Sequence, residues 1–300
     1  MTNKVRKIVV IGANGMLAQK VIEAADSAAK VICLDLPEFD ITDRVAVLHT
    51  IEELCPDVII NCAAYTQVDK CETEEALAFR VNGEGPGFLA EAAKECDAVL
   101  VHISTDYVFA GDSGTPYRED DPVGPLSVYG RSKLKGERAI IASGLLRYFI
   151  LRTSWLYGPG GPNFVETVLR LAAEREELRI VSDQIGSPTY TGDLARAIFA
   201  LLQKSDDGRG SIYGIYHFSG DGACSWYDFA SVIVARAQAA GIPLRVKTIT
   251  PITTADYPLP AIRPAYSVFN KSKYQTAVAA NIPQWQQSLQ IYLDERQAII

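Results

Sequence analysis

The sequence of 300 residues lacks the features that would place it in several common classes of protein. No apolar run approaches the ~18 residues that a membrane-spanning helix needs. The six cysteines include no C-x-x-C pair, and the three histidines stand apart from one another. Because zinc sites require clustered cysteine and histidine ligands, we expect no metal ion and reduced thiols.

Positive charge is also in short supply. The formal net charge is -7, and a nucleic-acid backbone is normally bound by a basic surface. A few local cations would still suffice to bind one phosphorylated small molecule. We therefore expect a small-molecule ligand, with neither a nucleic acid nor a membrane as partner.

Apolar and charged residues occur in the proportions of an ordinary globular protein, at 48% and 22%. The chain exceeds the ~100 to 200 residues of a typical domain, so we expect one large domain or two closely joined domains. The N-terminal residues run directly into a short β-branched segment and include no long apolar core of the kind found in signal peptides. We expect a cytoplasmic protein.

A short apolar strand at 7–11 is followed by a glycine turn and a helical pattern. The turn and the start of the helix contain Gly12, Asn14, Gly15, Met16 and Leu17. Backbone amides at such a helix N-terminus can hold the pyrophosphate of a dinucleotide. A second strand, at 31–34, ends just before Asp35, at about the ~20-residue spacing expected for the acid that binds the cofactor ribose. A loop-capping role for Asp35 is the alternative.

Strands and helices continue to alternate through the first half of the chain. We expect strands at 58–61, 99–103 and 148–152, and helices near 44–53, 74–80, 85–95 and 128–142. The strands are apolar throughout, which predicts burial on both faces. The predicted fold class is therefore α/β, a doubly wound parallel sheet of the Rossmann type, with its ligands beyond the carboxyl ends of the strands.

The pattern changes after Trp155, where proline-bounded loops separate shorter elements. We expect helices at 163–174, 192–203 and 225–240 and strands at 178–181 and 215–218. We assign 1–155 to the dinucleotide-binding domain, with 178–216 returning to it. We assign 156–177 and 217–300 to a smaller, interleaved substrate-binding lobe.

Tyr129 and Lys133 are four residues apart in the helix predicted at 128–142, so phenol and ammonium lie on one face. A free tyrosine has a pKa near ~10, and a neighbouring cation lowers it by favouring the phenolate. This pair therefore suits a tyrosine that donates a proton and a lysine that lowers the pKa of that tyrosine. Taken alone, the same spacing also fits a solvated helix surface.

Several motifs together resemble the extended short-chain dehydrogenase/reductases, and within them the dTDP-4-dehydrorhamnose reductase family. The resemblance extends from about residue 7 to about residue 293. The Gly12 turn and Tyr129-x-x-x-Lys133 are shared by the whole superfamily. The motif Ser-Thr-Asp-Tyr-Val-Phe at 104–109 is more specific to the narrower family. The other matching segments are 61–70, 152–155, 183–189, 261–264 and 283–285.

The resemblance implies reduction of the C4 ketone of dTDP-4-dehydro-6-deoxy-L-mannose to dTDP-L-rhamnose by NADPH or NADH. Such an enzyme serves dTDP-rhamnose biosynthesis and thus cell-surface polysaccharides, as a monomer or homodimer. Tyr129, Lys133 and Thr105 would be catalytic. The implied cofactor-binding residues also include Asp40, Ile41, Ala63, Ala64 and Tyr65. The implied substrate-binding residues are Thr105, Asp106, Tyr107, Trp155, Asn163 and Arg263.

The chain departs from the family pattern at three places. Tyr65 stands where the family often has histidine. Lys20 and Gly192 fall at positions where some members use glutamates to bind a metal ion at a dimer contact, so we expect no such metal. Asp35 should repel a ribose 2′-phosphate and keep NADH competitive, although the family often accepts NADPH.

Two other functions remain open at this stage. Nucleotide-sugar dehydratases and epimerases share the fold, but dehydratases place an Asp-Glu pair after the threonine, where this chain has Asp106-Tyr107. The regulatory beta subunit of methionine adenosyltransferase also resembles this family and acts as a binding partner without catalysis. The retention of Tyr129 and Lys133 favours an enzyme.

Overall fold

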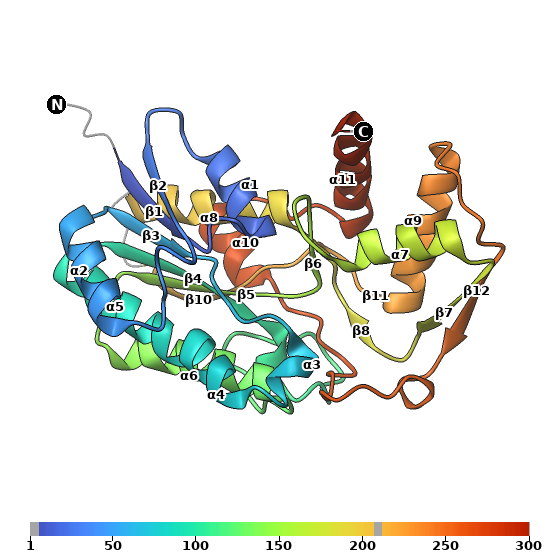
Figure 1. The fold of residues 1–300 in the computed structure, drawn as a ribbon, viewed down its shortest axis with the longest axis horizontal. Coiled ribbons are helices and arrows are strands. Elements are labelled where there is room, and N and C mark those ends of the chain that lie inside the picture. The colour runs from blue at the N-terminus through green and yellow to red at the C-terminus, as the bar shows by residue number, and fades with distance from the viewer. Residues whose placement is uncertain (1–5, 207–211, 300) are drawn as a thin grey trace.

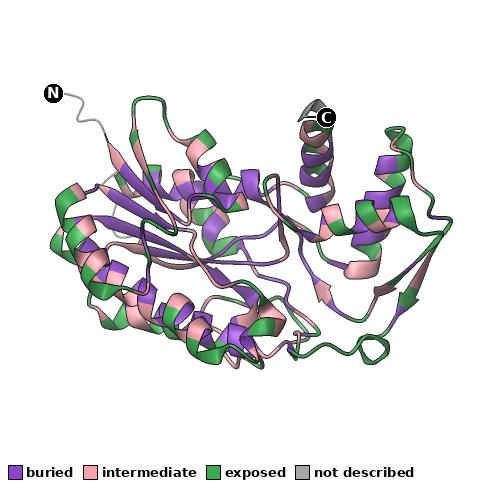
Figure 2. Ribbon diagram, in the orientation of Figure 1, coloured by how far each residue is buried: buried purple, intermediate pink, exposed green. Residues whose placement is uncertain are grey.

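A computed structural model describes residues 6–206 and 212–299. Its centre is a six-stranded parallel sheet (Figure 1). The strands lie in the order β10 (Gly214–His217), β5 (Tyr148–Thr153), β4 (Val99–Thr105), β3 (Val58–Asn61), β1 (Lys7–Ile11) and β2 (Lys30–Leu34). The inner strands are buried along their length (Figure 2), as a sheet covered on both faces requires.

Helices cover both faces of this sheet. The first face packs against α1 (Met16–Ala24), α8 (Thr191–Asp206) and α10 (Ser272–Val278). The second packs against α2 (Arg44–Leu54), α5 (Gly85–Glu95) and α6 (Val128–Ala142). The predicted fold class, a doubly wound parallel sheet, is therefore confirmed.

The chain reverses its direction of winding beside β1. It crosses one face through α1 to reach β2 and the other face through α2 to reach β3, so β1 lies between the two. The connections of a doubly wound sheet diverge at such a point and leave a crevice beyond the carboxyl ends of the strands. The residues that follow β1, β2 and β3 border this crevice.

A smaller lobe is built on α7 (Phe164–Glu174), α9 (Trp226–Ala239) and α11 (Trp285–Ile299). Its three two-stranded sheets pair β6 (Leu156–Tyr157) with β9 (Thr189–Tyr190), β7 (Glu177–Val181) with β12 (Thr248–Ile252), and β8 (Ile185–Gly186) with β11 (Cys224–Ser225). Figure 1 shows the segment after β12 running back from this lobe towards α3 (Val68–Cys71).

The structure corrects the predicted course of the chain at several places. The strand expected at 178–181 does not return to the large sheet: β7 pairs with β12 in the lobe, and only α8 and β10 return. Conversely, α10 packs on the large sheet. The helix expected at 74–80 is α4 (Glu75–Phe79) continued by a π-helical turn, Arg80–Glu84. Residues 1–5, at the start of the predicted first domain, lie outside the described ranges.

Candidate active site

The glycine turn after β1 is shaped to receive a phosphate group. Gly12 has a φ of +74°, and a Cβ there would lie 2.7 Å from the backbone of Ala63, so only glycine fits without strain. Gly15 begins α1 without a side-chain cap, which leaves the first amides of the helix open to an anion. These residues fit the pyrophosphate of a dinucleotide cofactor.

Asp35 lies beside this turn, immediately after β2. Its carboxylate accepts hydrogen bonds from the backbone amides of Asn14 (2.8 Å) and Leu36 (2.8 Å). The glycine turn and the predicted ribose-binding acid are thus fixed to each other. A cofactor ribose held at the turn would meet this carboxylate first.

The other predicted cofactor residues lie at different depths. Leu17 and Ile41 are buried in the two cores of the sheet. Met16 is half-buried, with its Sδ 3.7 Å from Asn163 Nδ2. Asp40 is exposed and accepts from the Thr42 amide. Ala64 is half-buried in the loop after β3.

Asn82, which the sequence did not single out, fixes the loop after β3. Its side-chain oxygen accepts from the Tyr65 amide (2.8 Å), and its Nδ2 donates to the Tyr65 carbonyl and to Ser132 Oγ (both 3.0 Å). This residue lies in the π-helical turn, a distortion that is frequent at functional sites. The phenol of Tyr65 itself donates to Glu74.

Helix α6 approaches the end of β4 unusually closely. Ser127 caps the helix by accepting from the Gly130 amide. A Cβ on Gly130 would lie 2.2 Å from the carbonyl oxygen of Tyr107, so a glycine is needed for this contact. As a result, the rings of Tyr107 and Tyr129 meet edge to face, with their centroids 5.5 Å apart.

Tyr129 and Thr105 are both buried and lie together. Burial raises the pKa of Tyr129, and the neighbouring Thr105 hydroxyl opposes only part of this shift. The net shift is upward because desolvation prevails, and the lowering of this pKa by Lys133 stays a prediction. A phenol that stays protonated suits a proton donor.

Lys133 is buried under the same site, 1% exposed. Its Nζ donates to the Ile103 carbonyl (2.6 Å) and lies 3.3 Å from His102 Nε2. Burial lowers the pKa of Lys133 to about 8. Lys133 is therefore an ammonium group that can lose its proton near neutral pH.

Asp106 is a buried carboxyl group beside these residues. Its Oδ1 accepts from the Thr105 hydroxyl (3.0 Å), while its Oδ2 has no hydrogen-bond partner among the described residues. Burial raises the pKa of Asp106 to about 6, although Ser267 and Thr105 oppose this shift. A buried carboxyl group that is incompletely paired can still accept a hydrogen bond from a hydroxyl-bearing ligand.

The predicted substrate-binding residues outside this cluster have partners of their own. Trp155 has a φ of +47° and stacks on Trp226, with centroids 3.5 Å apart. Asn163 caps α7 and donates to the carbonyls of Gly158 and Gly161. Its side chain thus holds the loop before α7, and the predicted contact with a phosphate stays a prediction.

Arg263 forms a two-pronged ion pair with Asp69 of α3, at 2.9 and 2.8 Å. The pair ties the segment after β12 to the first domain, next to Tyr107. Burial raises the pKa of Tyr107, and the charge of Arg263 opposes part of this shift. Asp69 also accepts from the Ala261 amide. The sequence indicated Arg263, but its partner could not be found by spacing.

The positions that depart from the family pattern are also occupied by structural contacts. Lys20 Nζ lies 2.8 Å from Glu23 and 3.0 Å from Glu295. A Cβ on Gly192 would lie 2.4 Å from the ring of Tyr190. No group of three histidine, cysteine, aspartate or glutamate residues that could hold a metal ion is found in the described ranges.

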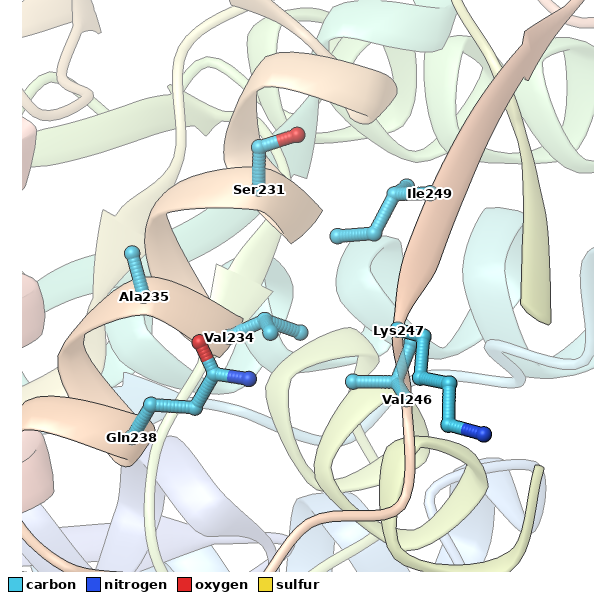
Figure 3. Close-up of a pocket in the computed structure, with 7 residues that line it drawn as sticks. All are labelled: Ser231, Val234, Ala235, Gln238, Val246, Lys247 and Ile249. Carbon is cyan, nitrogen blue, oxygen red and sulfur yellow. The ribbon is translucent and has the colours of Figure 1, made fainter. Parts of the chain in front are cut away.

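A small pocket of about 230 Å³ lies in the lobe, away from this site (Figure 3). Its walls come from α9 and from the segment that enters β12. Its one charged residue, Lys247, pairs with Glu176, so the pocket offers no reactive group. It is lined by Ser231, Val234, Ala235, Gln238, Val246, Lys247 and Ile249.

The doubly wound sheet, the glycine turn, and the buried Thr105, Tyr129 and Lys133 define the class: this is an extended short-chain dehydrogenase/reductase fold. The chain belongs to the family described as RmlD substrate binding domain, whose model matches residues 6–298. The resemblance inferred from the motifs is thereby confirmed.

Known relatives agree with this assignment. A dTDP-4-dehydrorhamnose reductase of Aggregatibacter actinomycetemcomitans is 43% identical over 285 residues, which cover 94% of this chain and 97% of the relative. Spore coat polysaccharide biosynthesis protein SpsK of Bacillus subtilis is 42% identical and covers 97% of this chain and 98% of its own. The solved structure of a dTDP-4-dehydrorhamnose reductase from Bacillus anthracis, in complex with NADP, has a TM-score of 0.91 and 38% identity, covering 97% of this chain and all of that one.

No helix in residues 6–206 and 212–299 combines the length and apolar character needed to cross a bilayer.

Proposed function

We propose that this chain reduces the C4 ketone of dTDP-4-dehydro-6-deoxy-L-mannose to dTDP-L-rhamnose, with NADH or NADPH as the reductant. The observation that carries the proposal is the burial of Tyr129 next to Thr105, at the end of β4, with Lys133 buried one turn further along α6. Relatives named dTDP-4-dehydrorhamnose reductase support the choice of substrate. The cytoplasmic location and the monomeric or homodimeric state expected from the sequence belong to the same proposal.

The reduced nicotinamide, when bound, supplies the hydride. The chain supplies a proton and a hydrogen bond at the oxygen on which negative charge develops. Tyr129, kept neutral by burial, gives its phenolic proton to that oxygen. The Thr105 hydroxyl, at the end of β4, orients the same oxygen. Asp106-Tyr107, in place of an Asp-Glu pair, leaves the chain without the acid that water elimination requires.

The first test is consumption of NADH and NADPH by the purified protein with the keto sugar nucleotide. We expect turnover with both cofactors, and formation of dTDP-L-rhamnose detected by chromatography. Oxidation of cofactor without this product would point to another keto-sugar nucleotide. No turnover although the cofactor binds would contradict the proposal and favour the regulatory-subunit function.

Asp35 is expected to decide the preference between the two cofactors. By this proposal its carboxylate meets the cofactor ribose, and it would then repel a 2′-phosphate by several kcal/mol at close range in a partly buried site. We expect Asp35→Asn to raise kcat/KM for NADPH by roughly tenfold, equivalent to about 1.4 kcal/mol, and to lower it for NADH.

Glu38→Gln is the matched control for this substitution, because it removes an exposed carboxylate three residues further along. It should leave both cofactor rates close to those of the parent enzyme. A strong NADPH preference in the unmodified protein, or no change in Asp35→Asn, would show that Asp35 does not act on the 2′ position.

A further inference from the structure

A line of three buried side chains runs beneath the site. Asn61, at the end of β3, contacts His102 of β4, and His102 contacts Lys133 of α6. The exposed fractions of the three are 0%, 1% and 1%. The distances are 3.1 Å from Asn61 Nδ2 to His102 Nδ1 and 3.3 Å from His102 Nε2 to Lys133 Nζ. The sequence had indicated only a packed or hydrogen-bonded role for His102.

The direction of these hydrogen bonds follows from one backbone group. The Ala63 amide donates to Asn61 Oδ1 (3.1 Å), and a backbone amide can only donate. The NH₂ group of Asn61 therefore faces His102 and must donate to Nδ1. Burial, the largest cause, places the pKa of His102 well below its ordinary value. A neutral imidazole that accepts at Nδ1 carries its proton on Nε2, the nitrogen that faces Lys133.

An N–H group that points at Lys133 favours one protonation state of the lysine. The ammonium form has no lone pair to accept this N–H, whereas the neutral amine does. In the amine form, Nζ accepts from His102 and still donates to the Ile103 carbonyl. All the hydrogen bonds in the line are then satisfied, which matters because buried polar groups are costly when unpaired.

We propose that His102, with its tautomer fixed by Asn61, is a positioning residue that favours the neutral amine of Lys133 and so sets the pH at which this lysine gives up its proton. The proposal rests on the proposed function. In the amine form, Nζ accepts the Nε2–H of His102, and the proton that it has released passes to solvent.

The other titratable groups that face these three side chains favour the charged form of Lys133. Glu137, one turn further along α6, and Cys62, after β3, both favour the ammonium form of Lys133. Glu137 is already paired with Arg152, and burial raises the pKa of Cys62 to about 12, so its thiol stays neutral. Their opposition does not cancel the effect of burial on Lys133.

The tautomer can be observed directly by ¹⁵N NMR of the free protein labelled at histidine, because the chain has three histidines. We expect His102 to carry its proton on Nε2 from about pH 6 to about pH 9. His217 should show the opposite tautomer, since its Nδ1 faces the Tyr117 carbonyl and its Nε2 faces Arg152. His102→Gln assigns the signals by their loss. A proton on Nδ1 of His102, or an imidazolium, would overturn the proposal.

Titration of Lys133, followed by its ¹³Cε shift and assigned with Lys133→Met, tests the consequence. In Asn61→Asp an acceptor faces Nδ1, the tautomer should reverse, and the midpoint should rise by more than one pH unit from about 8. In His102→Gln, the glutamine side chain can still accept a hydrogen bond from Asn61 through its oxygen and donate one to Lys133 Nζ through its NH₂ group. The midpoint of the Lys133 titration should therefore stay within about half a pH unit of the parent value.

The alkaline limb of the pH profile of kcat/KM should move with the midpoint in each variant. A higher midpoint in Asn61→Asp without reversal of the tautomer would reflect added charge alone and would contradict the role of His102. Both NMR measurements need no substrate. If the NMR spectra show the expected tautomers but the protein does not reduce the keto sugar nucleotide, the proposed function is refuted while this inference still stands.

Discussion

Replacement of Tyr129 by phenylalanine is expected to lower kcat by about 10²- to 10⁴-fold, the usual contribution of a positioned general acid. The phenol is the group beside Thr105 that combines burial with a retained proton. Phenylalanine keeps the ring and its edge-to-face contact with Tyr107 but has no proton to give. The measurement is steady-state turnover with the keto sugar nucleotide at saturating cofactor.

Two controls separate this effect from a loss of folding. Cofactor affinity should be unchanged within about threefold, because the glycine turn and Asp35 lie on other elements. Tyr148→Phe removes a phenol at the start of β5, at the opposite end of the strand from the site, and should leave kcat near the parent value. Residual turnover above a tenth of the parent rate in Tyr129→Phe would mean that another group donates the proton.

The sequence predicts this part of the site well because its signals are local. The turn at Gly12 lies between a strand pattern and a helical pattern that directly adjoin it in the sequence. Helix α6 begins at Val128 and ends at Ala142, as expected, since Ser127 caps it and its apolar spacing is regular. Tyr129 and Lys133 are then placed on one face by the helical repeat.

The residues that the sequence missed have partners far along the chain. Asp69 is identified by its ion pair with Arg263, and Asn82 by its bonds to Tyr65 and Ser132. No periodicity connects such pairs. The same limit explains why β7 was assigned to the wrong sheet, because a short apolar run does not indicate which strand it will pair with. Its partner β12 contains Pro251, and proline within a segment argues against a strand.

The ion pair between Arg152 of β5 and Glu137 of α6 is expected to carry the largest effect on stability. The two side chains are 3% and 1% exposed and are joined at 3.0 and 2.7 Å. Removal of one partner from a buried pair leaves an uncompensated charge, which costs about 3 to 5 kcal/mol. We expect Arg152→Met to lower the free energy of unfolding by that amount in urea denaturation.

The cost should come mainly from the unpaired carboxylate. Among the residues that the structure describes, the Ser104 hydroxyl is the one hydrogen-bond partner that Glu137 keeps when the guanidinium is gone. The double substitution Arg152→Met and Glu137→Met removes both charges. It should therefore recover much of the loss, since buried pairs replaced by apolar residues are often close to neutral in stability. A double variant as unstable as the sum of the two single variants would show that packing, not charge, is at stake.

Arg170 and Glu174 provide the matched control, because they form an ion pair one turn apart on α7 with side chains 61% and 53% exposed. Arg170→Met should change the unfolding free energy by no more than about 0.5 kcal/mol.

The comparison also bears on catalysis. Glu137 lies one turn beyond Lys133, so the buried pair fixes α6 against β5 at the level of the site. Arg152→Met should accordingly lower kcat even at temperatures where the variant remains folded, whereas Arg170→Met should not.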